Sequence, residues 1–259
     1  MDEILIDRSA GVMTLTLNRL AKKNSLTPAM YAAMADALLQ ADADATLGVV
    51  VLQGHETVFC AGNDIEDFLR RTATTQESPA FEFLRAISTF SKPLVASVCG
   101  PAVGVGTTML FHCDLVYAGD NAAFSMPFVN LGLCPEAASS YLVPQLMGHG
   151  RAAEALLLGE PFSAETALEI GLVSRIVPPA EAAALAQRQA RKLAAKPMRS
   201  LIETKRLMKS AQAAIVAQRM AEEGGSFARL LLEPAAREAF TAFVEKRQPN
   251  QENTDKTAV

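Results

Sequence analysis

The chain has 259 residues, of which half are hydrophobic and a fifth are charged, and its formal net charge is −4. This composition is typical of a globular protein with a substantial buried core, and the length predicts one large domain or one domain with an appendage. The weak negative charge gives no basis for binding to nucleic acid or to an anionic membrane surface.

Residue spacing argues against metal sites and membrane spans. The four cysteines lie in apolar or glycine-rich surroundings without metal-ligand spacing, and the three histidines are scattered. We therefore expect reduced cysteines, a cytoplasmic protein and no metal site. Residues 93–113 carry no charge, but prolines and glycines divide this run into strand, turn and helix, so we expect no membrane-spanning segment.

The first part of the chain predicts an alternation of strands and helices. Val12–Leu17 alternates in the manner of a half-buried strand. Thr27 and Pro28 are typical of a helix start, because threonine caps and proline suits the first turn. The apolar run Val49–Leu52 predicts a buried strand before a glycine turn. A helix around Phe68–Leu69 and a polar stretch from Thr72 to Ser78 follow.

The middle of the chain continues in the same way. A strand over 93–98 leads through a glycine-rich turn into a helix over 107–111, which ends at His112, where a cation would meet the helix dipole. Pro135 and Glu136 predict the start of a helix that runs to Met147. The remaining elements expected here are a strand at 115–117, helices at 151–158 and 163–170, and a strand at 174–177.

Beyond residue 180 the sequence predicts helices, with breaks at Pro197, Gly224–Gly225 and Pro234. We divide the chain into an α/β core at 1–180, a helical region at 181–247 that serves as a lid or in oligomerisation, and a disordered tail at 248–259. Little sequence remains to cover the apolar side chains near the end of the helical region, and this predicts a subunit contact through Phe240, Phe243 and Val244.

Two glycine-containing loops and one acid form the strongest functional pattern. The loops are Phe59–Asp64 and Gly100–Gly106, each of which follows a predicted strand, and the acid is Glu136. Two such turns can aim backbone N–H groups at one point and hold an oxyanion, and a nearby acid could move a proton. Taken singly, these features also suit ordinary turn glycines and an acid at a helix start.

The order and spacing of several blocks resemble the crotonase (enoyl-CoA hydratase/isomerase) superfamily. The resemblance extends from about Val12 to the late helices. It implies an α/β fold, a crotonase-like spiral of repeated ββα units with a helical C-terminal region, which assembles as a homotrimer or hexamer. The blocks are Phe59–Asp64, Lys92–Ala96, Gly104–Gly106, Cys113–Leu115, Gly132–Leu133, and Ala164–Ala167 followed by Gly171–Val173.

The resemblance also implies particular site residues. The backbone N–H groups of Asn63 and Val105 would form the oxyanion hole. Val105 stands where the family usually has glycine, and because a β-branched residue resists positive φ, we expect ordinary dihedrals there. Asp64 could instead be a simple cap, and the basic residues near Lys22 suit a solvated surface equally well. The residues implied in coenzyme A binding are Lys22, Lys23, Ala61, Asp64, Phe243 and Lys246.

Two departures from the family pattern bear on the reaction. The hydratases of the family add water with two glutamates, and the corresponding positions here are Thr108 and Phe128. The remaining acid, Glu136, lies in the sequence Pro-Glu-Ala-Ala-Ser-Ser, which is similar to the context of the sole base in Δ3,Δ2-enoyl-CoA isomerases of peroxisomal type. A dry, apolar pocket formed by Met126, Phe128 and Leu133 would raise the pKa of this glutamate, and Thr108 would also belong to the substrate pocket.

The preferred hypothesis is therefore a Δ3,Δ2-enoyl-CoA isomerase of fatty-acid β-oxidation. Its substrate is an acyl-CoA thioester, so coenzyme A enters with the substrate and no separate cofactor is expected. Two alternatives are another acyl-CoA enzyme of the family, such as an enoyl-CoA hydratase, and a non-catalytic acyl-CoA-binding module. A dinucleotide-binding domain is less favoured, because Gly104 and Gly106 lack the third glycine of that fingerprint. The sequence leaves the acyl chain length open.

Overall fold

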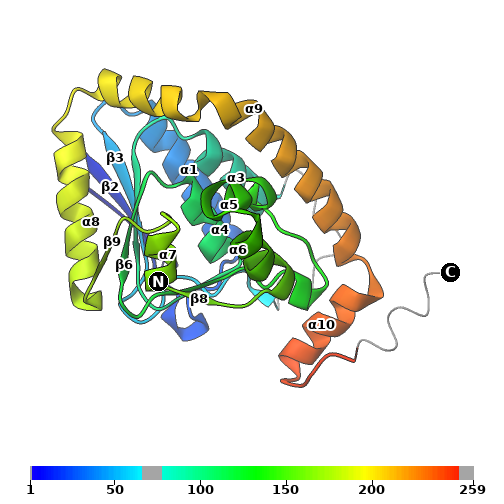
Figure 1. The fold of residues 1–259 in the computed structure, drawn as a ribbon. Helices are drawn as coiled ribbons and strands as arrows, with labels where there is room; N and C mark the ends of the chain where they lie inside the picture. Colours follow the sequence, from blue (N-terminus) through cyan, green and yellow to red (C-terminus); the bar gives the residue numbers. More distant parts are fainter. Residues whose placement is uncertain (1, 66–77, 251–259) are drawn as a thin grey trace.

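The computed structural model describes residues 2–65 and 78–250, and its main sheet has six strands (Figure 1). The strand order is β1-β2-β3-β4-β6-β9. Strand β1 runs antiparallel to β2, and the other neighbouring pairs are parallel. The strands are β1 (Ile4–Ser9), β2 (Val12–Leu17), β3 (Val49–Gln53), β4 (Leu94–Val98), β6 (Leu115–Gly119) and β9 (Arg175–Val177).

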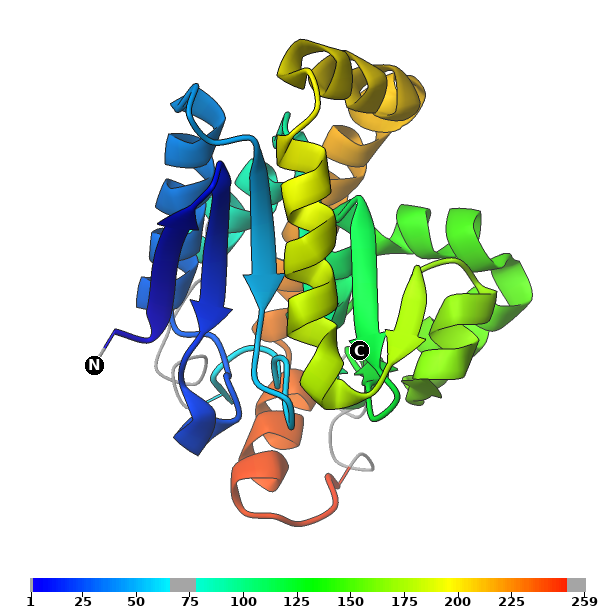
Figure 2. The same cartoon turned by 90° about the vertical axis from the view of Figure 1, so that its left-hand side faces the viewer.

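Helices cover both faces of this sheet. Helix α8 (Pro179–Ala194) packs through Leu185 and Ala186 on one face, and α1 (Pro28–Ala43) and α3 (Pro79–Thr89) lie on the other (Figure 2). The expectation of a half-buried strand at Val12–Leu17 is therefore wrong, since five of its six residues are buried. Parallel strands between two helical layers are buried on both faces.

A small second sheet, β5-β7-β8, lies beside the main sheet. Strand β5 (Pro101–Val103) occupies part of the segment that the sequence predicts as a turn, and the following helix α4 (Val105–Thr108) begins earlier than expected. The helix expected around Phe68–Leu69 lies outside the described residues. The other short elements are η1 (Leu20–Lys22), η2 (Met109–His112), β7 (Ala123–Ser125), η3 (Val129–Leu131), α6 (His149–Ala153), η4 (Glu154–Leu158), β8 (Phe162–Ser163) and α7 (Ala164–Glu169).

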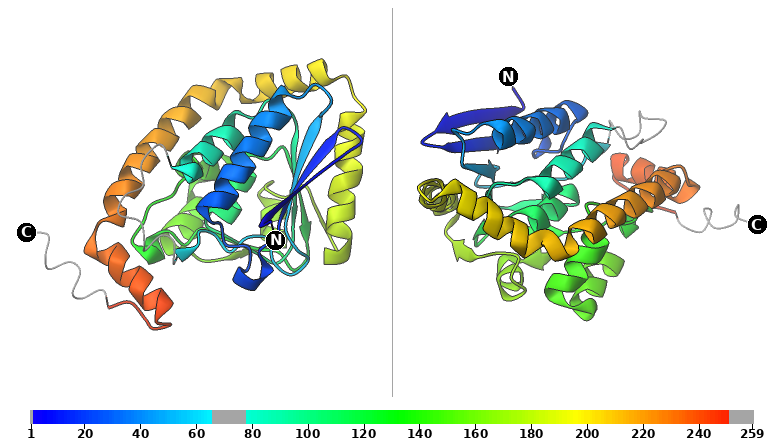
Figure 3. Two further views of the ribbon diagram at one scale, coloured as in Figure 1. Left: turned by 180° about the vertical axis from the view of Figure 1, so that it is seen from behind. Right: turned by 90° about the horizontal axis from the view of Figure 1, so that it is seen from above.

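The C-terminal region consists of α8, α9 (Met198–Leu231) and α10 (Pro234–Val244), and α9 arches over the α/β core (Figure 3). The predicted break at Gly224–Gly225 is wrong, because α9 continues through both glycines for 34 residues. A Cβ atom at Gly224 would lie 3.1 Å from the Phe81 ring. The absent side chain thus lets the helix pack closely on α3, and this contact offsets the low helix propensity of glycine.

Helix α10 packs on its own subunit. Phe240 is only 4% exposed and lies in a cluster with Met126 and Phe128, so its predicted exposure for a subunit contact is wrong. Phe243 and Val244 are 61% and 50% exposed, as that contact would require. Within residues 2–65 and 78–250, no helix is long and apolar enough to cross a membrane.

Candidate active site

The two glycine loops lie side by side and form one wall of a pocket. The Cys60 N–H donates to the Pro101 carbonyl at 3.1 Å, and the Val103 N–H donates to the Cys60 carbonyl at 2.9 Å. A Cβ atom at Gly106 would lie 2.7 Å from the Cys60 carbonyl oxygen, so only glycine permits this approach. We call residues 60–64 and 102–106 the turn wall.

The turn wall presents two backbone N–H groups to the pocket. Gly62 and Gly104 adopt φ values of +91° and +55°, and they direct the amides of the next residues, Asn63 and Val105. Val105 has ordinary dihedrals at the start of α4, as its β-branched side chain predicts. Among the described residues, neither amide donates to a protein acceptor. Both residues line a cavity of about 340 Å³, where this pair of donors could bind an oxyanion.

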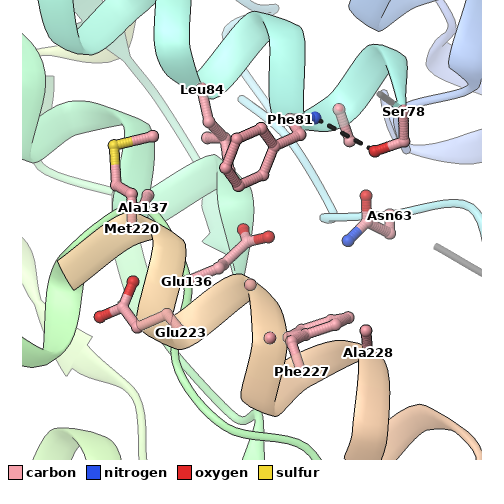
Figure 4. Close-up of a pocket in the computed structure, with 13 residues that line it drawn as sticks. Asn63, Ser78, Phe81, Leu84, Glu136, Ala137, Met220, Glu223, Phe227 and Ala228 are labelled. Atoms are coloured by element: carbon pink, nitrogen blue, oxygen red, sulfur yellow. Dashed lines mark hydrogen bonds between the residues drawn. The ribbon is translucent and has the colours of Figure 1, made fainter. Parts of the chain in front are cut away.

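The opposite side of the pocket carries Glu136. Helix α5 (Ser139–Met147) begins at Ser139 rather than at Glu136, because Ala137 and Ala138 adopt φ values of +61° and +57°. The predicted helix-start position of Glu136 is therefore wrong, and the carboxyl group extends from a tight loop (Figure 4). Glu223 of α9 holds this loop from behind. We call residues 136–140 together with Glu223 the acid wall.

Burial sets the protonation of Glu136. The pKa of its carboxyl group is raised to about 7, chiefly by desolvation and then by the negative charge of Glu223, while the hydrogen bond from Thr108 acts in the opposite direction. The Thr108 hydroxyl lies 3.4 Å from the Glu136 carboxyl oxygen and is fully buried. A carboxyl group with a pKa near neutrality can both take and return a proton.

His112 supports the acid wall as a neutral group. Burial lowers the pKa of its imidazole to about 4, so the predicted cation at the helix end is wrong. The Nε2 atom lies 2.8 Å from the Ala137 carbonyl oxygen, to which a neutral ring can donate. The side chain of Lys209 donates to the backbone carbonyl of His112 at 2.9 Å. His112 thus ties the loop of Glu136 to η2.

Asn63 belongs to both halves of the pocket. It lines the cavity of the turn wall and also a smaller cavity of about 130 Å³, whose other lining residues include Glu136, Phe81, Leu84 and Met220 (Figure 4). The Tyr31 hydroxyl donates to its side-chain oxygen at 2.5 Å. Asn63 and Phe227 thus line both cavities, which places the cavity of Glu136 next to the cavity of the turn wall.

The remaining predicted pocket residues lie on the turn-wall side. Phe128 and Leu133 line the larger cavity together with Phe243 of α10, and Met126 is fully buried beside them. Thr108 lies against Glu136 instead. All four residues that the sequence assigns to the substrate pocket are thus found near the two walls.

The predicted coenzyme A residues form two groups. Lys22 ends η1, and the backbone carbonyl of Lys23 accepts a hydrogen bond from the Ala61 N–H at 3.0 Å, so this basic segment is fixed next to the turn wall. The Asp64 carboxylate forms an ion pair with Arg19 at 2.6 Å. Phe243 of α10 lines the larger cavity, and Lys246 follows just after this helix ends at Val244.

Two functional candidates were missed by sequence reasoning, namely Glu223 and Phe227. Phe227 lines both cavities, and Glu223 lines the smaller one. Nothing in the local sequence distinguishes Glu223 from its exposed neighbour Glu222. The glycine pair that follows, in the interior of a helix, is the one available indication that α9 approaches another element closely here.

The fold and the comparisons with known proteins place this chain among the acyl-CoA enzymes of the crotonase superfamily. The sequence model of the Enoyl-CoA hydratase/isomerase family matches residues 7–254, and the chain belongs to this family. A solved structure of Pseudomonas aeruginosa OdaA superposes with a TM-score of 0.92 at 45% sequence identity, and the match covers 94% of this chain and 99% of that one.

Relatives with different activities are similar to this chain. Enoyl-CoA delta isomerase 2 of Rattus norvegicus is 40% identical over 68% of the chain, and the match spans 46% of that protein, less than half its length. The 2,3-dehydroadipyl-CoA hydratase of Escherichia coli is 31% identical over 96% of the chain and 98% of its own length. Membership of the family therefore leaves isomerisation and hydration both open.

Proposed function

We propose that this protein is a Δ3,Δ2-enoyl-CoA isomerase that moves a double bond with one base. The observation that carries the proposal is Glu136, a partly buried carboxyl group with a pKa raised to about 7 that lines a cavity together with Asn63. A base of this pKa can exist in both protonation states at neutral pH, as a shuttle requires.

The reaction follows from this arrangement. Ionised Glu136 takes a proton from C2 of a 3-enoyl thioester, and the electron pair moves through the conjugated system to the thioester oxygen. The amides of Asn63 and Val105 stabilise the resulting dienolate. Protonated Glu136 then returns the proton at C4, and the double bond ends between C2 and C3. No water and no second acid are consumed.

Hydration of a 2-enoyl thioester is disfavoured by the same residues. It requires one group to activate water and a second to protonate the neighbouring carbon. Thr108 and Phe128 occupy the two relevant positions, and neither titrates near neutral pH. Glu223 does not replace them, because its two carboxyl oxygens accept hydrogen bonds from the Ala138 and Ser140 amides.

The proposal extends to assembly and location. The exposed Phe243 and Val244 would pack against a second copy of the chain in a trimer or hexamer. All four cysteines are free thiols, which suits a reducing compartment such as the cytoplasm. Light scattering at micromolar concentration tests the assembly, and a stable monomer or dimer would exclude it.

A side-by-side turnover assay tests the activity. Purified protein is given 3-enoyl-CoA or 2-enoyl-CoA under the same conditions, and the products are separated by chromatography. We expect conversion of 3-enoyl-CoA to 2-enoyl-CoA, with little 3-hydroxyacyl-CoA formed from either substrate. Rapid hydration of 2-enoyl-CoA would assign the protein to the hydratases instead. Binding without turnover would assign it to the non-catalytic modules.

A further inference from the structure

A buried carboxylate, Glu223 of α9, lies behind the proposed base. Its side chain is buried, with 6% of the residue exposed, and both oxygens are used. One accepts from the Ala138 N–H at 2.6 Å, and the other accepts from the Ser140 N–H at 2.9 Å. Glu223 thus binds the loop that follows Glu136 through two hydrogen bonds, although 87 positions separate Glu136 and Glu223 in the sequence.

We propose that Glu223 is a positioning residue for Glu136: it fixes the loop that carries the base, and its own negative charge keeps the proton on Glu136. The inference rests on the proposed function only for its catalytic consequence. The electrostatic coupling of the two carboxyl groups can be measured without turnover.

The hydrogen bonds decide which of the two groups holds the proton. Burial raises the pKa of both carboxyl groups. Glu223 receives two backbone N–H donors, which favour its ionised form, whereas Glu136 receives only the long contact from the Thr108 hydroxyl. When one proton is available to the pair, it therefore resides on Glu136, and the charge stays on Glu223.

The other charged and titratable groups around Glu136 and Glu223 do not supply the negative charge that keeps the proton on Glu136. Arg219 lies one turn before Glu223 on α9 and favours its ionised form, but Arg219 also pairs with exposed Glu222 at 3.2 Å. Burial raises the pKa of the thiol of Cys60 on the turn wall to about 12 and also raises that of Cys134. Both thiols are therefore neutral at physiological pH.

The remaining neighbours lie behind the loop. His112 of η2 is neutral, because burial lowers its pKa to about 4, and it contacts the Ala137 carbonyl. The positive charge of Arg229 on α9 partly offsets the rise in the pKa of the Cys134 thiol. Among the described residues, Glu223 is the charged group with the largest effect on Glu136, so removing that one charge tests the inference.

The experiment is a carboxyl carbon NMR titration of protein labelled at glutamate Cδ. The signal of Glu136 is assigned by its loss in Glu136→Gln. We compare the wild type with Glu223→Gln, which retains shape but not charge, and with Glu222→Gln, which removes an exposed charge one position away. The midpoint of Glu136 should fall by about one pH unit in Glu223→Gln and stay unchanged in Glu222→Gln.

A third variant distinguishes the effect of the charge of Glu223 from the effect of its position. It also shows whether a change in the midpoint comes from misfolding. Glu223→Asp keeps the charge but has a shorter reach, so the midpoint of Glu136 should remain near that of the wild type. An unchanged midpoint in Glu223→Gln, or an equal fall in Glu223→Asp, would overturn the inference. A shifted midpoint in a protein that proves not to isomerise 3-enoyl-CoA would sustain the coupling and refute the proposed function alone.

Discussion

The turn wall and the acid wall line two cavities that share Asn63 and Phe227, but they are built from different chemistry. The turn wall offers main-chain N–H groups, which glycines at 62, 104 and 106 position through backbone geometry. The acid wall offers a side chain, Glu136, whose protonation depends on burial and on a residue from a distant helix. Side-chain substitution should therefore affect the acid wall strongly and the turn wall only where a glycine is lost.

The largest effect is expected at the acid wall. Glu136→Gln keeps size and hydrogen bonding but removes the base, so turnover of 3-enoyl-CoA should fall by about 10²- to 10⁴-fold. Steady-state kinetics measure this loss, and binding of a substrate analogue by calorimetry should persist. Glu222→Gln is the matched control with wild-type turnover. Unimpaired turnover in Glu136→Gln would place the base elsewhere.

The same substitution should stabilise the protein at high pH. Because the pKa of Glu136 is about 7 in the folded state, the folded protein holds this proton up to about pH 7, whereas the unfolded chain releases it near the ordinary glutamate pKa of 4.5. The free energy of unfolding of the wild type therefore falls as the pH rises between these values. Relative to wild type, Glu136→Gln should gain about 3 kcal/mol between pH 4.5 and pH 8.

Urea denaturation at these two pH values measures the gain. His112 titrates in an overlapping range, but it is present in both proteins and cancels from the difference. A stability difference that does not change with pH would show that the pKa of Glu136 is not raised. The acid wall would then not differ from the turn wall in its electrostatics.

In the turn wall, substitution of a glycine is expected to lower both stability and turnover. In Gly106→Ala the new methyl group would meet the Cys60 carbonyl oxygen at 2.7 Å, and the two loops must separate. We expect a loss of about 1–3 kcal/mol in stability and at least a roughly tenfold loss of turnover, because the two amides no longer point at one position.

Gly150→Ala is the matched control for this substitution, since no atom lies within 4 Å of the added methyl group. Thermal unfolding and turnover are measured on both variants. Wild-type activity in Gly106→Ala would mean that the spacing of the loops does not matter to catalysis.

The smallest effect is expected at Asn63. Its proposed role uses the main-chain N–H, so Asn63→Ala should keep turnover within about tenfold of the wild type. The Tyr31 hydroxyl loses its 2.5 Å contact in this variant, and Tyr31→Phe serves as the control for that loss. A fall of several orders of magnitude in Asn63→Ala alone would assign the side chain a catalytic role.

The sequence by itself determined the local elements and the main-chain half of the site. The strands at 49–53 and 94–98 follow from β-branched runs, the start of α1 follows from Thr27 and Pro28, and ordinary dihedrals at Val105 follow from its branching. These features depend on neighbouring residues alone, and so the sequence pattern is sufficient to predict them.

Tertiary structure alone decided the acid wall. The pKa of Glu136 depends on burial beneath α9 and on Glu223, and these residues meet only because α9 continues through Gly224 and packs on Phe81. For the same reason the sequence placed Glu136 in a helix and Phe240 at a surface, whereas packing put the first in a loop and buried the second. Long-range packing and desolvation leave no local pattern in the chain.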